Sequence, residues 1–172
     1  MKPRLALIMG STSDLPQVEP SLTTLRELGI PFTLRVLSAH RTPVEAGAFA
    51  AGAADQGLEV IIAVAGAAAH LAGAMTAHTD LPVIGVPLNA TSLAGLDALL
   101  ATVQMPGGVP VATMGIGRSG VKNAVIFAAR ILARGDKEVA ARLASMRRAQ
   151  ARKVLAADEE TREKYSWRGD GA

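Results

Sequence analysis

Short apolar runs alternate with helical stretches along most of the chain, and this alternation restricts the fold more than any other feature. The run Leu5-Ala6-Leu7-Ile8-Met9 is continuously apolar and stops at Gly10, which is typical of a strand buried on both faces of a parallel sheet. Further strands are expected at 32–37, 60–64, 83–86 and 109–114. Because helical stretches separate them, right-handed crossovers would place all these strands in one parallel sheet. The pattern predicts a doubly wound α/β domain.

The expected helices have recognisable start and stop residues. Asp14 is placed to cap the first helix, Pro16 falls in its first turn, and Gly29 is a suitable C-terminal stop. Beyond the sheet region, 136–157 is predicted to be a charged amphipathic helix. The polar tail 158–172 is expected to be extended, either against a partner or as a frayed end. The other helices are expected at 43–57, 68–78, 93–103 and 121–134.

The composition argues against several classes of function. There is no cysteine, which removes disulfides, thiolate nucleophiles and iron–sulfur or zinc-thiolate sites. The net charge of +3 is small, and one Trp, one Tyr and three Phe offer few stacking platforms, so no nucleic-acid partner is expected. No stretch is apolar enough to span a bilayer, and Met1-Lys2-Pro3-Arg4 does not begin a signal peptide. These features favour a cytoplasmic protein without a membrane partner.

Three polar loops each follow an expected strand. Since ligands of doubly wound sheets bind at the carboxyl ends of the strands, these loops are predicted to form one site. The first, Gly10-Ser11-Thr12-Ser13-Asp14, offers backbone N–H groups and the hydroxyls of Ser11 and Ser13 at a helix N-terminus, as a phosphate loop does. A turn that only caps a helix would look the same. Asp14 would repel a phosphate but suits the hydroxyls of a ribose.

The second loop, Ser38-Ala39-His40-Arg41-Thr42-Pro43, sets a proton carrier beside a permanent cation. Arg41 can form bidentate bonds to a phosphate or carboxylate, and His40 can exchange a proton near neutral pH. In the alternative interpretation the histidine caps a helix and the arginine meets solvent. The pairing favours chemistry on a sugar phosphate.

The third loop runs from Gly66 through three alanines to His70 and Leu71. Its small side chains would let backbone amides approach a ligand closely. A histidine bonded locally at the start of a helix is an equally good interpretation of His70. His78 lies near the end of the same expected helix, where the helix dipole favours a cation, and is expected to be structural.

Two further features argue against bound cofactors. The histidines lack the spacing of metal ligands and no carboxylate cluster joins them, so no metal is predicted. The segment Gly115-Ile116-Gly117-Arg118-Ser119-Gly120 contains G-x-G-x-x-G, but it lies late in the chain and lacks the acidic residue that binds the ribose of a dinucleotide. We interpret it as a glycine-rich turn.

The Pro/Gly-rich segment 103–110 would serve as a lid, a contact between subunits or an ordinary connector.

Taken together and in order, these motifs resemble the PurE family, the class I N5-carboxyaminoimidazole ribonucleotide (N5-CAIR) mutases of purine biosynthesis. The resemblance extends from Leu5 to about Leu155. It rests on Met9-Gly10-Ser11-Thr12-Ser13-Asp14, Ser38-Ala39-His40-Arg41-Thr42-Pro43, Ala68-Ala69-His70-Leu71, Pro82-Val83-Ile84-Gly85-Val86-Pro87, Val103-Gln104-Met105-Pro106 and Lys122-Asn123-Ala124.

The resemblance implies a flavodoxin-like three-layer sandwich with a C-terminal helical extension, assembled into a homo-octamer with sites built from more than one subunit. It implies a single catalytic domain over 1–157, a polar tail over 158–172, and transfer of a carboxylate from the exocyclic nitrogen to C4 of an aminoimidazole ribonucleotide without cofactor or metal. His40 is the implied acid/base group. The residues expected to bind the substrate are Ser11, Ser13, Asp14, Ser38, Arg41, Gly66, Ala68, His70 and Leu71.

The chain departs from the family pattern at Ala67, where a glycine is usual, at Ala72, where a proline is usual, and at Leu15, where a tryptophan is common. These changes affect loop rigidity and pocket shape rather than reaction type. Other activities remain open on this fold. One is a carboxylase that uses CO2 and aminoimidazole ribonucleotide (AIR) directly, although Arg41 and the Ala-His-Leu run favour the mutase. The others are a non-catalytic flavin or nucleotide binder and a structural oligomer.

Overall fold

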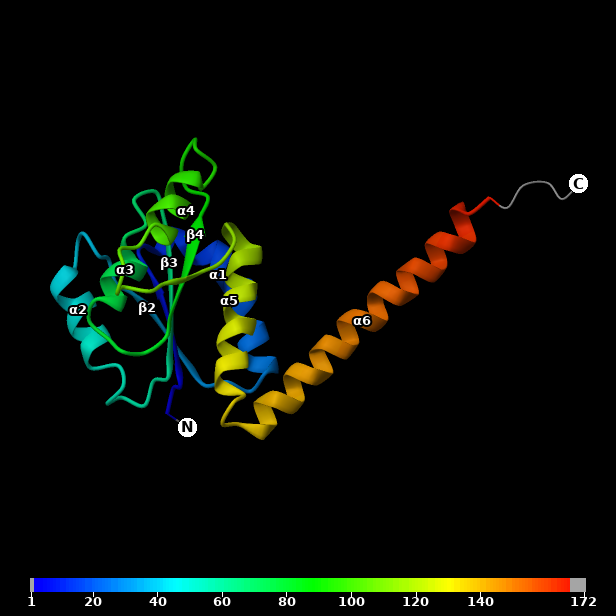
Figure 1. Ribbon diagram of the computed structural model, residues 1–172, viewed down its shortest axis with the longest axis horizontal. Helices are drawn as coiled ribbons and strands as arrows, with labels where there is room; N and C mark the ends of the chain where they lie inside the picture. Colours follow the sequence, from blue (N-terminus) through cyan, green and yellow to red (C-terminus); the bar gives the residue numbers. More distant parts are fainter. Residues whose placement is uncertain (1, 168–172) are drawn as a thin grey trace, which may run out of the picture.

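The strands of the computed structural model, which describes residues 2–167, form one parallel five-stranded sheet in the order β2-β1-β3-β4-β5 (Figure 1). Because β1 lies between β2 and β3, the chain winds outward from β1 in one direction and from β3 in the other. The order switches between these two strands. The strands are β1 (Leu5–Met9), β2 (Phe32–Val36), β3 (Val60–Gly66), β4 (Val83–Leu88) and β5 (Ala112–Thr113).

Helices cover both faces of the sheet, as Figure 1 shows, and this arrangement with its strand order confirms the flavodoxin-like fold. Alternate residues of β1 point to opposite faces: Leu5 and Leu7 join the core under α1 and α5, and Ile8 joins the core under α2 and α3. The helices are α1 (Leu15–Glu27), α2 (Pro43–Ala51), α3 (Leu71–Thr76), α4 (Leu96–Val103), α5 (Gly117–Leu132) and α6 (Lys137–Tyr165).

The two ends of α1 differ in how well they agree with the prediction from the sequence. Gly29 has a φ of 68°, and Ile30 N donates to Leu25 O at 3.0 Å, so α1 ends in the predicted glycine stop. Asp14, however, makes no side-chain cap of α1. Its carboxylate turns back to accept a hydrogen bond from Ser11 N, at the start of a short 3-10 helix, η1 (Thr12–Asp14). The prediction that Asp14 caps α1 is therefore wrong.

Several other boundaries differ from the predictions for local reasons. α3 begins at Leu71 rather than 68, because the left-handed Ala67 (φ 52°) sends the chain through tight turns first. α4 begins after Gly95, which has a φ of 87°. α2 stops before Gly52, which weakens helix propagation. β5 keeps two residues, since the preceding prolines cannot donate to a sheet.

The glycine-rich segment 115–120 was predicted to be a turn. Instead, its residues from Gly117 onward form the start of α5. Gly117 starts the helix with a φ of 76°, and a Cβ at Gly120 would overlap the carbonyl of Gly115. The glycines therefore allow a tight backbone turn at the start of α5.

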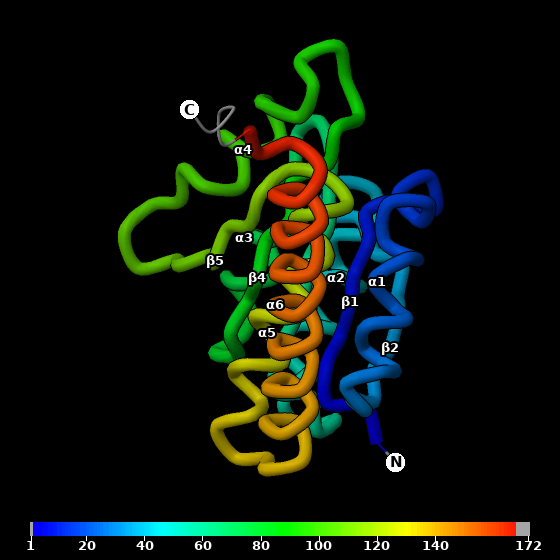
Figure 2. The backbone as a smooth tube through the Cα atoms, turned by 90° about the vertical axis from the view of Figure 1, so that its right-hand side faces the viewer, coloured from blue at the N-terminus to red at the C-terminus, as the bar shows by residue number. Residues whose placement is uncertain are grey.

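The C-terminal helix is longer than predicted. α6 continues to Tyr165, so 158–165, which we expected to be extended, are helical. Ser166 and Trp167 are not helical, and the last residues of the predicted tail, 168–172, lie outside the described residues. Figure 1 shows α6 leaving the domain at the base of α5, and Figure 2, turned by 90°, shows the same helix in front of the sheet and its covering helices. Among the described residues no helix is both long and apolar enough to cross a membrane.

Candidate active site

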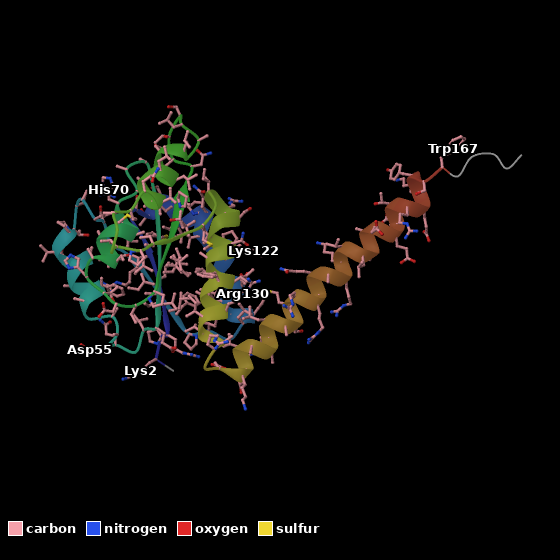
Figure 3. All side chains as sticks on the ribbon, in the orientation of Figure 1. Lys2, Asp55, His70, Lys122, Arg130 and Trp167 are labelled. Atoms are coloured by element: carbon pink, nitrogen blue, oxygen red, sulfur yellow. The ribbon has the colours of Figure 1, made fainter. Side chains whose placement is uncertain are left out.

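A cavity of 360 Å³ opens at the carboxyl edge of the sheet, beside the switch between β1 and β3. Figure 3 labels His70 at this end of the domain and Lys2 and Asp55 at the opposite end. The loops after β1, β2 and β3 form the walls, and Ala90 adds a contact from the segment after β4. Every residue predicted to act in the site lines this cavity: Ser11, Ser13, Asp14, Ser38, His40, Arg41, Gly66, Ala68, His70 and Leu71.

The first loop is held together by its own polar groups. Ser11 Oγ accepts hydrogen bonds from Ser13 N at 3.2 Å and from Ser13 Oγ at 2.8 Å. Asp14 Oδ2 accepts from Ser11 N at 3.0 Å. Burial raises the pKa of Asp14, while hydrogen bonds from the backbone of Ser11 and Gly10 and the charge of Arg41 act against this rise. A carboxylate is thus kept at the cavity despite the cost of burying it.

The second loop is organised by Ser38. Its hydroxyl accepts from the backbone N–H of His40 at 3.3 Å and of Arg41 at 3.1 Å, and Thr42 Oγ1 accepts from Ser38 N at 2.9 Å. These bonds fix the backbone that carries the histidine and the arginine. Arg41 Nη2 also donates to Gly10 O at 2.8 Å and so joins the second loop to the first. Its guanidinium is solvent-exposed and has further donors for an anion.

The most informative contact joins the second and third loops. His40 Nε2 lies 2.8 Å from His70 Nδ1, and the two rings meet edge to face at 82°. One hydrogen must lie between these nitrogens for the contact to be a hydrogen bond, so the pair has to hold at least one proton there. His40 Nδ1 and His70 Nε2 remain free to meet a substrate. The sequence predicted His70 only as a binding residue and gave no sign of this contact.

The third loop is shaped by close backbone approach. A Cβ at Gly66 would lie 2.5 Å from Ala90 Cβ, so glycine is required at this position. At Ala67 the left-handed backbone carries a side chain that glycine would lack. Ala72 is buried against Gly85, and Leu15 is half-buried against the core under α1. The departures at 67, 72 and 15 are thus accommodated without blocking the cavity.

Sequence reasoning missed one wall of the site. Ala90 follows β4 just as the other lining segments follow their strands, so the rule that ligands bind at carboxyl ends would have identified it. His78 lies outside the cavity, against Gly47 of α2. In the segment predicted as a lid or connector, Met105 packs over Gly73 of α3. The described residues include no cluster of three or more His, Cys, Asp or Glu side chains that could hold a metal ion.

Comparison with known proteins identifies the family. A sequence model described as AIR carboxylase matches residues 4–153. The chain belongs to the AIR carboxylase family. Within this family it is 51% identical over 150 residues to an N5-carboxyaminoimidazole ribonucleotide mutase of Brucella melitensis, covering 87% of this chain and 93% of that protein. An Escherichia coli K12 protein with the same name is 46% identical over 152 residues, covering 88% and 90%.

A solved structure of the AIR carboxylase family agrees with the fold. The crystal structure of Treponema denticola PurE superposes with a TM-score of 0.81 at 28% identity, covering 96% of this chain and 99% of that chain. The resemblance to PurE proteins inferred from the motifs is therefore confirmed.

Proposed function

We propose that this chain is an N5-CAIR mutase, which interconverts N5-CAIR and 4-carboxy-5-aminoimidazole ribonucleotide (CAIR) in purine biosynthesis. The observation that carries the proposal is the convergence of His40, His70 and Arg41 on one cavity in a chain 46–51% identical to proteins of that name. A histidine supplies the proton transfers that carboxylate migration requires, and an arginine supplies a cation for the substrate.

In this proposal the first two loops bind the ribonucleotide. Ser11 and Ser13 offer hydroxyls, and Arg41 offers the N–H groups that its bond to Gly10 O leaves free. Asp14 accepts hydrogen bonds from ribose hydroxyls, which agrees with a carboxylate buried at the cavity wall. Ser38 orients His40 and Arg41 through their backbone. Gly66, Ala68, His70 and Leu71 form the wall near the transferred carboxylate.

The proposed chemistry needs one proton that is given and later recovered. His40 protonates the carbamate nitrogen, the N–CO2 bond breaks, and CO2 stays in the cavity beside the amine. The electron-rich C4 then attacks CO2 to form the new C–C bond. Removal of the C4 proton by the same imidazole restores the aromatic ring, so the proton balance is zero. Small side chains around Gly66 leave room for CO2 and for backbone donors to the migrating carboxylate.

The test follows the absorbance of purified protein given N5-CAIR without bicarbonate or ATP. We expect conversion to CAIR, and we expect His40→Asn to abolish turnover, by at least about 10²-fold, while ribonucleotide binding is retained. Turnover unchanged in His40→Asn would refute the role of His40. The second candidate is direct carboxylation of AIR, favoured by the description of the family. Product formed only from AIR plus bicarbonate would establish that activity instead.

The proposal includes a homo-octamer that works in the cytoplasm, with sites completed by neighbouring subunits. Self-association is supported by an exposed apolar stripe on and before α4, whose members recur at helical spacing: Leu93, Leu96, Leu100 and Val103, which are 59%, 52%, 47% and 49% exposed. Sedimentation equilibrium of the purified chain would measure the assembly. A cytoplasmic location agrees with a chain that has no cysteine.

A further inference from the structure

The segment that carries Ala90 is folded back on itself by two successive left-handed residues. Ala94 has a φ of 53° and Gly95 a φ of 87°, just before the start of α4. A Cβ at Gly95 would lie 3.3 Å from Leu88 O, so the two ends of the segment meet in a close backbone contact. Figure 1 shows this segment, 89–95, beyond the end of β4, and Ala90 brings it to the cavity.

Within this segment, the hydroxyl of Thr91 is hydrogen-bonded on two sides. Thr91 Oγ1 accepts from Leu93 N at 3.1 Å and donates to Asp97 Oδ2 at 2.8 Å. Asp97 lies in the first turn of α4, and α4 packs closely on β4, where Thr102 Cγ2 fills the space beside Gly85. The bond between Thr91 and Asp97 therefore ties the segment to a helix that is itself fixed on the sheet.

This bond is the firm anchor closest to Ala90. On the other side of Ala90, the hydrogen bond from Gln17 Nε2 to Asn89 O is 3.5 Å long and contributes little. Ala90 itself is exposed, and its Cβ lies where a side chain at Gly66 would have to go. The position of Ala90 against Gly66 thus depends on the residue that follows it, Thr91.

The carboxylate of Asp97 is kept in the fold at a cost. Its second oxygen, Oδ1, is buried and accepts no hydrogen bond from the described residues. An unpartnered buried polar atom destabilises a fold, so it calls for an explanation. The dipole of α4 favours an acidic side chain in the first turn, but a carboxylate at an exposed position of that turn would serve as well. The contact that distinguishes Asp97 is its bond to Thr91.

We propose that Asp97 is a positioning residue of the mutase, and that it acts through Thr91 to hold Ala90 against Gly66. This inference rests on the proposed function. In that reaction CO2 leaves the exocyclic nitrogen and must stay beside the ring until C4 attacks it. Ala90 and Gly66 meet in the wall near the transferred carboxylate. A fixed wall keeps CO2 close to C4 and prevents its loss to water.

Release of Ala90 would allow a second outcome for the same intermediate. His40 protonates the carbamate nitrogen and the N–CO2 bond breaks, as in the proposed reaction. If CO2 then escapes, C4 keeps its proton, AIR remains in the site, and the imidazole of His40 takes a new proton from water. One carbamate and one proton thus give one CO2 and one AIR. The fraction of N5-CAIR that becomes AIR instead of CAIR therefore measures how well the wall is held.

Three variants change the link, and one tests the alternative of a general loss of stability. Thr91→Val removes the hydroxyl at nearly constant volume, and Thr91→Ser is its matched control because it keeps the hydroxyl. Asp97→Asn weakens the bond by removing the charge of the acceptor. Thr102→Val removes another hydroxyl of α4, which donates to Ala98 O at 2.7 Å and does not touch Thr91. It should lower the free energy of unfolding and leave the product fraction unchanged.

The measurement is a single turnover with enzyme in excess over N5-CAIR, followed by chromatography of AIR and CAIR. AIR that forms without enzyme is subtracted. We expect the AIR fraction to rise at least about threefold in Thr91→Val and to rise also in Asp97→Asn. In Thr91→Ser it should stay at the value of the original chain. Thr91→Val with Asp97→Asn should be no worse than Thr91→Val alone, because both changes act through one bond.

The original chain separates failure of this inference from failure of the proposed function. If the original chain forms CAIR and Thr91→Val gives the same AIR fraction, the positioning role is overturned and the proposed function stands. An equal rise in Thr91→Ser or Thr102→Val would overturn it as well, since general instability would then account for the loss of CO2. If the original chain forms no CAIR, the proposed function is contradicted, and this inference is overturned with it.

Discussion

His40 and His70 have the shortest contact between titratable side chains in the cavity, with 2.8 Å between Nε2 and Nδ1. We propose that the contact gives the two histidines different roles. In the proposed mutase, His40 exchanges a proton with the substrate through Nδ1, while His70 contacts the other ring nitrogen of His40, Nε2. A histidine whose second nitrogen is held in this way has a defined orientation, as the base of a catalytic triad does. His70 is then a positioning residue rather than only a binding residue.

This division of roles predicts how His70 variants differ. His70→Leu removes the nitrogen that His40 contacts, so kcat should fall about 10–100-fold, with a smaller change in KM. His70→Asn places its amide oxygen near the position of the lost Nδ1 atom, where it can accept a hydrogen bond from His40 Nε2, and it should recover part of kcat. Steady-state kinetics with N5-CAIR give both constants. If His70 only binds substrate, KM will rise in both variants and kcat will stay near the original value.

At the scale of elements, sequence reasoning succeeded where a local rule is sufficient. Runs of mainly apolar residues located every strand, and Gly29 ended α1 because its backbone is left-handed. It failed where a nearby backbone decides the outcome. Ala67 has a φ of 52°, although nothing in a run of alanines indicates a left-handed residue, and this turn delays α3 to Leu71.

The conformation of Ala67 leads to a stability prediction for the third loop. An alanine in the left-handed region costs about 1–2 kcal/mol, and glycine avoids this cost at the expense of a more flexible unfolded chain. Ala67→Gly should therefore raise the free energy of unfolding by about 0.5–1 kcal/mol, measured by urea denaturation. Ala68→Gly is the control, because Ala68 has no positive φ, and it should lower stability by a similar amount. A loss of stability in both variants would show that Ala67 is not strained.

At the scale of the whole molecule, the edge of the sheet formed by the carboxyl ends of the strands differs from the opposite edge. The carboxyl edge carries the cavity, and its location could be predicted because the carboxyl ends of parallel strands meet there. The separation of His40 from His70 could not be predicted, since it depends on how two loops fold. At the opposite edge Arg4 binds Glu59 and Asp136, and so links β1, β3 and the start of α6. Sequence patterns gave no sign of this network, whose members are far apart in the chain.

The network at this edge makes the stability of the fold depend on pH. Asp136 Oδ1 accepts from Val139 N and Glu138 N, and Arg4 binds the other carboxylate oxygen. Hydrogen bonding from Val139 N and then from Arg4 lowers the pKa of Asp136 below its usual value of 3.8. The folded state therefore holds the carboxylate more strongly than the unfolded state does. This stabilisation is complete above pH 3.8 and is lost as the pH falls through the lowered pKa.

Asp14 acts with the opposite sign and in a different range. Burial raises its pKa above 3.8, so the cost of its buried charge is relieved as the pH falls towards that value. Below 3.8 the loss should come from groups such as Asp136, and Asp136→Asn isolates its share. Asparagine can still cap α6, but it carries no charge for Arg4 and does not titrate. Urea denaturation between about pH 5 and pH 2 should show a shallower loss of stability in Asp136→Asn than in the original chain. Equal slopes below pH 3.8 would mean that the link between Arg4 and Asp136 contributes nothing to the acid stability of the fold.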